Sequence, residues 1–132
     1  MRPPTLILLV ACLALGCRRG EFHISGTITV ASSLQHKMPA ENSVLFVIVK
    51  NRGGVPVAVR RIVNPQFPVS FEVGARDLLV PELRGRDALL IQVQMNTHGN
   101  VGAPVRGDLQ GDHPDAAYQG ENNIHIVLDR QL

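Results

Sequence analysis

Apolar residues recur at every second position in most of the apolar segments of this chain, and this period predicts β-strands rather than helices. Residues 44–49 are an exception: they are continuously apolar, which is typical of a central strand covered on both faces. Only residues 32–38 and 77–80 could form single helical turns. The predicted strands are residues 22–30, 44–49, 55–63, 69–73, 89–95 and 124–129. We therefore predict an all-β fold, a small antiparallel β-sandwich of about six to seven strands.

The first 17 residues have a different character. Arg2 is their only charge, and an unbroken apolar run extends over residues 6–15. This run is too short for a hydrocarbon core of about 30 Å, which needs about 20 residues, but it fits the apolar part of a secretory signal. It ends at Gly16 and Cys17, the pattern of a bacterial lipoprotein signal whose cysteine becomes the lipidated N-terminus. We predict a signal at residues 1–16, a lipidated tether at 17–21 and a single domain at 22–132.

Other readings of this segment stay open. Cys12 follows a better lipoprotein pattern, Leu-Val-Ala, but cleavage there would leave a very short signal, so we favour Cys17. An uncleaved anchor or a plain secretory signal is the further alternative. Arg18 stands where an aspartate would favour retention at the inner membrane, so we expect a periplasmic protein held by lipid to the outer membrane.

Charge and cysteine content exclude several classes of function. The chain has 13 Lys and Arg and 11 Asp and Glu, and loss of Arg2 with the signal leaves 12 basic side chains. This balance argues against nucleic acid, because a basic patch supplies most of the affinity for it. The two cysteines, Cys12 and Cys17, both lie within the first 17 residues, so the body has no disulfide and no thiolate metal site.

Motifs for catalysis and for metal binding are missing from the body. It has no GxSxG, no phosphate-binding loop and no HExxH. Asp108, Asp112 and Asp115 lack the alternating spacing of an EF-hand. A cysteine-free metal site using His98 and His113 is conceivable. We expect a protein that is not an enzyme and has no cofactor or metal.

Residues 53–71 combine strand-forming residues with residues that interrupt strands. Residues 51–54, Asn-Arg-Gly-Gly, predict a hairpin turn between the second and third strands. Pro56 has no N–H, so its strand is expected to lie at the edge of a sheet or to start irregularly. An edge strand offers unpaired backbone groups, which can bind an extended peptide.

The same strand holds a pair of arginines, Arg60 and Arg61, which are expected to point to opposite faces because side chains alternate along a strand. One could then point towards a partner, while the other would lie at the sheet margin or pair with an acid. The alternative is that both are solvated charges that protect the edge from aggregation.

Several segments occur in an order that is typical of one family. They are residues 24–30 (ISGTITV), 44–47 (VLFV), 56–61 (PVAVRR), 67–71 (FPVSF), 107–111 (GDLQG) and 126–130 (IVLDR). Through them the body, over residues 23–131, resembles the C-terminal periplasmic domain of the CycH/CcmI family of cytochrome c-type biogenesis proteins. Residues 73–79 depart from the acidic, methionine-containing segment of that family. Its full-length members also have transmembrane helices and a helical-repeat region before this domain, so we expect here the β module alone.

The resemblance implies an accessory, chaperone-like factor that binds apocytochrome c or a protein of the haem-ligation complex and performs no catalysis. It implies Arg60 as a contact for an acidic or C-terminal element of the client, with Arg61 and Asp108 as further candidate partner-binding residues. A pair between Arg60 and Asp108 that serves only the fold is equally open. Two other readings remain: a lipid-anchored β-sandwich outside cytochrome maturation, and a small metal-binding protein.

Overall fold

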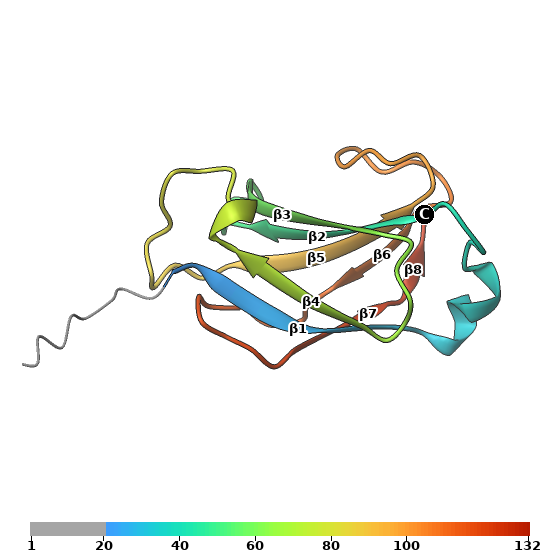
Figure 1. Ribbon diagram of the computed structural model, residues 1–132, viewed down its shortest axis with the longest axis horizontal. Coiled ribbons are helices and arrows are strands. Elements are labelled where there is room, and N and C mark those ends of the chain that lie inside the picture. The colour runs from blue at the N-terminus through green and yellow to red at the C-terminus, as the bar shows by residue number, and fades with distance from the viewer. Residues whose placement is uncertain (1–20) are drawn as a thin grey trace, which may run out of the picture.

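Two β-sheets packed face to face make up the structure, a computed structural model that describes residues 21–132 (Figure 1). The three-stranded sheet has the order β4-β1-β7 and the five-stranded sheet the order β3-β2-β5-β6-β8. The elements in chain order are β1 (His23–Val30), η1 (Ser32–Lys37), β2 (Val44–Lys50), β3 (Pro56–Val63), β4 (Val69–Gly74), η2 (Ala75–Asp77), β5 (Leu90–Asn96), β6 (Leu109–Asp112), β7 (Ile124–Leu128) and β8 (Arg130–Gln131). The predicted all-β sandwich is confirmed.

The strand inventory and one strand direction differ from the prediction. All six predicted strands are present, but β6 and β8 were not expected. The prediction of a purely antiparallel sandwich is wrong at one place, because β7 pairs with β1 in parallel, with Gly26 opposite Ile124 and Val30 opposite Leu128. The chain crosses from the five-stranded sheet to the three-stranded sheet between β6 and β7. After this crossing, β7 pairs with the side of β1 that is not bonded to β4, and it runs in the same direction as β1.

Burial on both faces of β2 confirms its prediction as a central strand. Leu45, Val47 and Val49 point inwards and belong to the main core, which also contains Ile24 and Ile126. The alternate residues of β2 form a small second cluster on the outer face of the five-stranded sheet. Its members are Val44, Phe46 and Ile48, with Val59 packed against them.

The turn between β2 and β3 is followed by a bulge, which determines the residues of β3 that face the core. The Oδ1 of Asn51 accepts hydrogen bonds from the backbone N–H groups of Gly53 and Val55, at 2.9 and 3.0 Å. The register then shifts, because Lys50 pairs with Pro56 but Val49 pairs with Ala58, which leaves Val57 as an extra residue. β3 lies at the sheet edge, as Pro56 predicted.

Different loops and chain ends lie at the two ends of the sandwich. The described chain begins with Glu21 at the end that also holds the β2–β3 turn and the loop of residues 79–88 (Figure 1). η1, the β3–β4 connection, the loop of residues 97–107 and the C-terminus lie at the opposite end. The predicted signal, and the tether up to residue 20, lie outside the described residues. Within residues 21–132, none of the helices has the length and apolar character that crossing a membrane requires.

Candidate functional site

Arg60, in β3, forms an ion pair with Asp77, the last residue of η2. The register places it opposite Val47, whose side chain faces the core. Its Nη1 donates to Oδ1 of Asp77 at 3.4 Å, and Oδ2 of Asp77 accepts from the backbone N–H of Gly74 at 2.9 Å. The Arg60 side chain is 33% exposed. The pair between Arg60 and Asp108 is therefore not formed, because the partner of Arg60 is Asp77.

Arg61 points to the other face, as the alternation predicted. It lies opposite Phe46 on the outer face of the five-stranded sheet and is exposed. Among residues 21–132 it forms no ion pair. Of the two arginines, Arg61 is thus the one whose guanidinium is available to a partner, although a partner contact by either stays a prediction.

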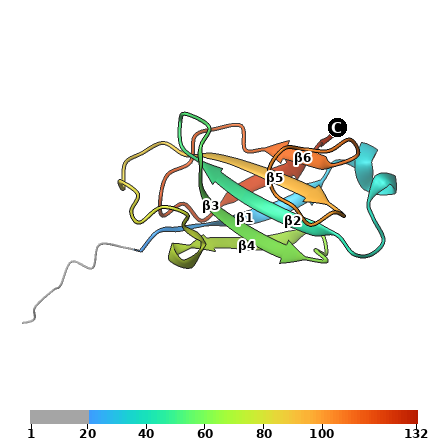
Figure 2. The same cartoon turned by 90° about the horizontal axis from the view of Figure 1, so that it is seen from above.

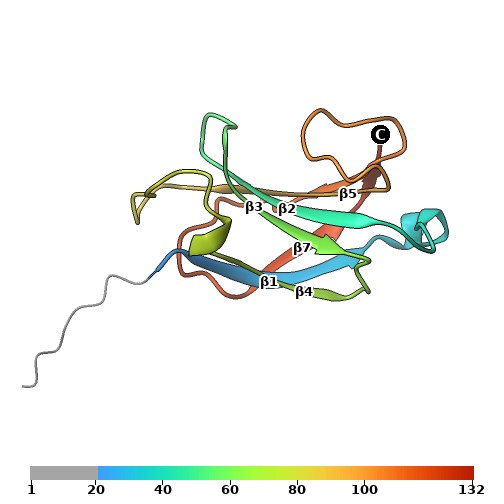
Figure 3. The same ribbon diagram turned by 45° about the horizontal axis from the view of Figure 1, so that its top comes forward.

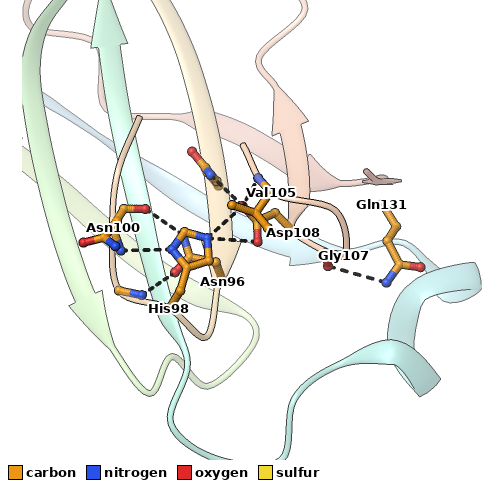
Figure 4. Close-up of polar contacts among 9 residues, drawn as sticks. Asn96, His98, Asn100, Val105, Gly107, Asp108 and Gln131 are labelled. Atoms are coloured by element: carbon orange, nitrogen blue, oxygen red, sulfur yellow. Dashed lines mark hydrogen bonds and ion pairs between the residues drawn. The ribbon is translucent and has the colours of Figure 1, made fainter. Parts of the chain in front are cut away.

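Asp108 organises a loop on the outer face of the five-stranded sheet. After β5 the chain arches over that face in residues 97–107 and returns as β6 (Figures 2 and 3). The Oδ2 of Asp108 accepts hydrogen bonds from the backbone N–H of Val105 at 2.9 Å, from Nε2 of Gln94 at 3.1 Å and from Nε2 of His98 at 3.0 Å (Figure 4). Asp108 is 5% exposed and Gln94 is 1% exposed. The buried carboxylate therefore has its hydrogen-bonding capacity occupied from within the chain.

Further bonds hold the two ends of the loop. The Oδ1 of Asn96 accepts from the backbone N–H of Gly99 at 2.8 Å, and its Nδ2 donates to the carbonyl of Asn100 at 3.0 Å (Figure 4). At the other end, the backbone N–H of Gly107 donates to the carbonyl of Leu132 at 2.6 Å. The loop is thus connected to β5 and to the C-terminal residues as well as to Asp108.

The GDLQG segment, residues 107–111, has a structural explanation at each of its key positions. Gly107 has φ +100°, a conformation that glycine adopts without strain. Leu109 belongs to the main core. Gly111 lies against β7, where a Cβ would come within 1.9 Å of the carbonyl oxygen of Val127. Asp108 itself offers a partner little surface, because it is 5% exposed. Its hydrogen bonds give it a structural role in the loop, and its contact with a partner stays a prediction.

The environment of Asp108 has opposing effects on its ionisation. Burial by itself raises the pKa of the carboxyl group, because the charged form loses hydration. The hydrogen bonds from Val105, His98 and Gln94, together with the positive charge of His98, act in the other direction and leave the pKa below its ordinary value. The folded state therefore binds the proton at Asp108 less readily than the unfolded chain does.

This difference predicts a loss of stability in acid. The contribution of Asp108 is complete above the pKa of an unfolded aspartate, about 4, and is lost as the pH falls through the lower pKa of the folded state. As the pH is lowered below about 4, we expect the urea concentration at the unfolding midpoint to decrease in the wild type and to decrease less steeply in Asp108→Asn. Asp115→Asn, at an exposed aspartate, is the control. Parallel profiles for wild type and Asp108→Asn would contradict the assignment.

Two residues of the site were not identified in their present roles from the sequence. Asp77 was not singled out, and His98 was considered only as a metal ligand with His113. Within residues 21–132, no three His, Cys, Asp or Glu side chains converge on a common point. Instead His98 pairs with Asp108. The ten-residue separation of His98 and Asp108 across a loop gives no periodic signal, so this pair could not be read from spacing.

Comparisons with known proteins agree with the resemblance read from the sequence. The family model described as the cytochrome c-type biogenesis protein H Ig-like domain matches residues 24–129. The chain is also similar to an uncharacterized protein of Aquifex aeolicus (strain VF5), with 27% identity over 109 residues, which are 82% of this chain and 71% of that protein. No solved structure matches significantly. The family match spans both sheets of the sandwich, from β1 to the end of β7.

Proposed function

Because the chain belongs to the family of the cytochrome c-type biogenesis protein H Ig-like domain, we propose that it is a non-catalytic accessory factor that binds apocytochrome c. Family membership indicates a role in cytochrome c maturation. The observation that supports the proposal is the extent of the match, which covers residues 24–129 and thus almost the entire sandwich. A protein of the haem-ligation complex is the other partner that this role allows.

The proposal includes a location. Family membership indicates a periplasmic or membrane-associated protein. We propose that lipid attached to Cys17 holds the domain at the membrane, preferably the outer membrane. The apolar run of residues 6–15 and the Gly16-Cys17 pair that follows it support this. A bacterial lipid anchor with several acyl chains is retained firmly, whereas one chain binds only marginally.

A second candidate function is a lipid-anchored binding or structural module outside cytochrome maturation. It is favoured by the finding that GDLQG serves the fold, through the occupied carboxylate of Asp108 and the close approach of Gly111 to β7. A module with a different partner would need the same residues in order to fold. The shared segments therefore establish the family more firmly than they establish the client.

Binding of apocytochrome c separates the two candidates. We expect the full-length chain, held in lipid nanodiscs, to bind a haem-free cytochrome c with an intact CxxCH segment, and to bind the same protein in its folded haem-bound form at least about tenfold more weakly, because the folded form buries the apolar segments that a chaperone contacts. Biolayer interferometry gives both affinities. Equal binding of the two forms, or no binding of either, would contradict the proposal and favour the second candidate.

A further inference from the structure

An apolar hollow of about 480 Å³ lies at the end of the sandwich opposite Glu21. It is formed where the end of β1, the residues after η1 and the β3–β4 connection meet (Figure 1). Its lining is mostly apolar, with Thr29 and Gln35 at its polar positions. The apolar lining residues are Val30, Met38, Pro39, Pro65, Phe67 and Pro68. Among the residues that the structure describes, no carboxylate and no cationic side chain lines this hollow.

The fold only partly buries these residues. Leu34 of η1 belongs to the main core, so η1 is already anchored by another side chain. Val30, Met38 and Phe67 are half-buried and pack against the edge of the core. Their remaining apolar surface faces the hollow. An apolar ligand would remove that surface from water, at a gain of roughly 25 cal/mol for each Å².

A second hollow adjoins the first. Its volume is about 350 Å³, and the two hollows share Pro39 in their lining. Its cationic residues are Lys37 and Arg106, which are both exposed, and His98 also belongs to its lining. Asp108, the one carboxylate that the described part of the chain contributes to this lining, is 5% exposed. It is already bonded to His98, Gln94 and Val105. Among residues 21–132, Lys37 and Arg106 form no ion pair, so this hollow presents positive charge.

Position also favours a ligand at this end. The described chain enters the sandwich at Glu21, at the far end of both sheets (Figure 1). A domain tethered through its N-terminus would direct this end away from the tether. The adjoining apolar and cationic surfaces would thus be open to a polypeptide approaching from the periplasm.

We propose that the two hollows form one binding site for a polypeptide segment that has an apolar side chain next to a carboxylate, with the apolar group on Met38 and Phe67 and the carboxylate on Lys37 and Arg106. This deepens the proposed function and rests on it, since it names the part of the apocytochrome client that is bound. The apolar hollow provides affinity through burial, and the two cations select for the acidic neighbour. Arg61, on the outer face of the β3 edge, lies outside the lining of both hollows.

Two probes of matched sequence test the chemistry. They are a biotinylated pentapeptide, Ala-Leu-Phe-Glu-Ala, and the same peptide with glutamine in place of glutamate, both capped at the two ends. We expect the full-length chain in nanodiscs to bind the glutamate peptide about three- to tenfold more tightly, which is the range for two exposed charge contacts. In the double variant Lys37→Glu with Arg106→Glu this preference should disappear. Phe67→Ser should weaken both peptides by about tenfold.

A control variant makes the test specific. Arg84→Glu with Arg86→Glu reverses two exposed arginines in the loop of residues 79–88, at the opposite end of the sandwich. It changes the net charge by the same amount and is expected to alter neither affinity more than about twofold. An equal loss in this control would overturn the site, because it would show that net charge alone governs binding. Absence of any preference for the glutamate peptide would overturn it as well.

A measurement on the wild type guards against variants that fail to fold. A benzophenone group in place of the phenylalanine ring of the probe should cross-link to residues 35–39 and 65–68, as read by mass spectrometry. Cross-links confined to other residues would overturn the site. If apocytochrome c binds but neither the Lys37/Arg106 reversal nor Phe67→Ser weakens it, the site is wrong while the proposed function stands. If the peptides bind here and apocytochrome c does not, the proposed function is wrong.

Discussion

Replacement of Gly111 by alanine is expected to lower the free energy of unfolding by at least about 3 kcal/mol. The added Cβ would stand 1.9 Å from the carbonyl oxygen of Val127, 2.7 Å from its carbonyl carbon and 3.1 Å from the Cα of Leu128. All three atoms belong to the backbone of the β7 segment, so no side-chain rotation relieves the overlap. β6 and β7 would have to separate where the two sheets meet. We expect the melting temperature to fall by more than about 10 °C.

The same substitution at Gly85 provides the matched control. Gly85 is exposed and its φ lies outside the left-handed range. No atom of residues 21–132 lies within 4 Å of the position that a Cβ would occupy. Gly85→Ala should therefore leave stability within about 0.5 kcal/mol of the wild type, or raise it slightly through the entropy of the unfolded chain. Thermal unfolding followed by circular dichroism measures both variants. A Gly111→Ala protein as stable as Gly85→Ala would show that β6 and β7 are not in close contact.

The period-two pattern predicted the fold class because every second residue of a strand faces the core and must be apolar. In β4, Val69, Phe71 and Val73 are all buried in the main core, as their alternation with polar residues indicated. β6 has the sequence LQGD, in which Leu109 is its one core residue, so it offers no alternation to detect. β8 is two residues long. The parallel pairing of β7 depends on a crossover between sheets, which local patterns do not encode.

The assignment of the two arginines shows where strand alternation fails. Alternation alone would place Val57 and Val59 on one face of the strand and Arg60 on the other. In the structure, only Val57 of these two valines belongs to the main core. The register shift beside Pro56 inserts one residue, so Ala58 and Arg60 face inwards and Val59 joins the outer cluster. A single bulge exchanges the faces of every later residue in the strand. The opposite orientation of Arg60 and Arg61 could be predicted, but which one points outwards could not.

Asp108 illustrates a different limit. The resemblance marked it as one of the residues that define GDLQG, and the sequence left open whether it serves the fold or a partner. Its three donors come from Gln94 on β5, and from His98 and Val105 in the loop. Their convergence depends on how residues 97–107 fold back over the sheet, which no spacing rule describes. The candidate site of Lys37, Phe67 and Arg106 could not be predicted for the same reason, since three separate connections build it.

Replacement of Asp108 by alanine is expected to lower the free energy of unfolding by about 2–4 kcal/mol at neutral pH. The variant leaves the amide of Gln94, a residue that is 1% exposed, without its acceptor, and a buried donor that loses its partner costs about 1–3 kcal/mol. The backbone N–H of Val105 loses the same acceptor. It also removes the negative charge beside His98, which reaches Asp108 at 3.0 Å. The midpoint of urea unfolding measures the loss, with the m-value as the check that the transition stays two-state.

Asp87→Ala is the control, because Asp87 is exposed. It is expected to change stability by less than about 0.5 kcal/mol. Asp108→Asn should fall between the two, since an amide oxygen can still accept from Gln94 and Val105 while the charge next to His98 is gone. If Asp108→Ala and Asp87→Ala were equally stable, the loop of residues 97–107 would be held without Asp108. The aspartate of GDLQG would then be free for a role in partner binding, and the effect of Asp108→Ala on apocytochrome c binding would measure that role directly.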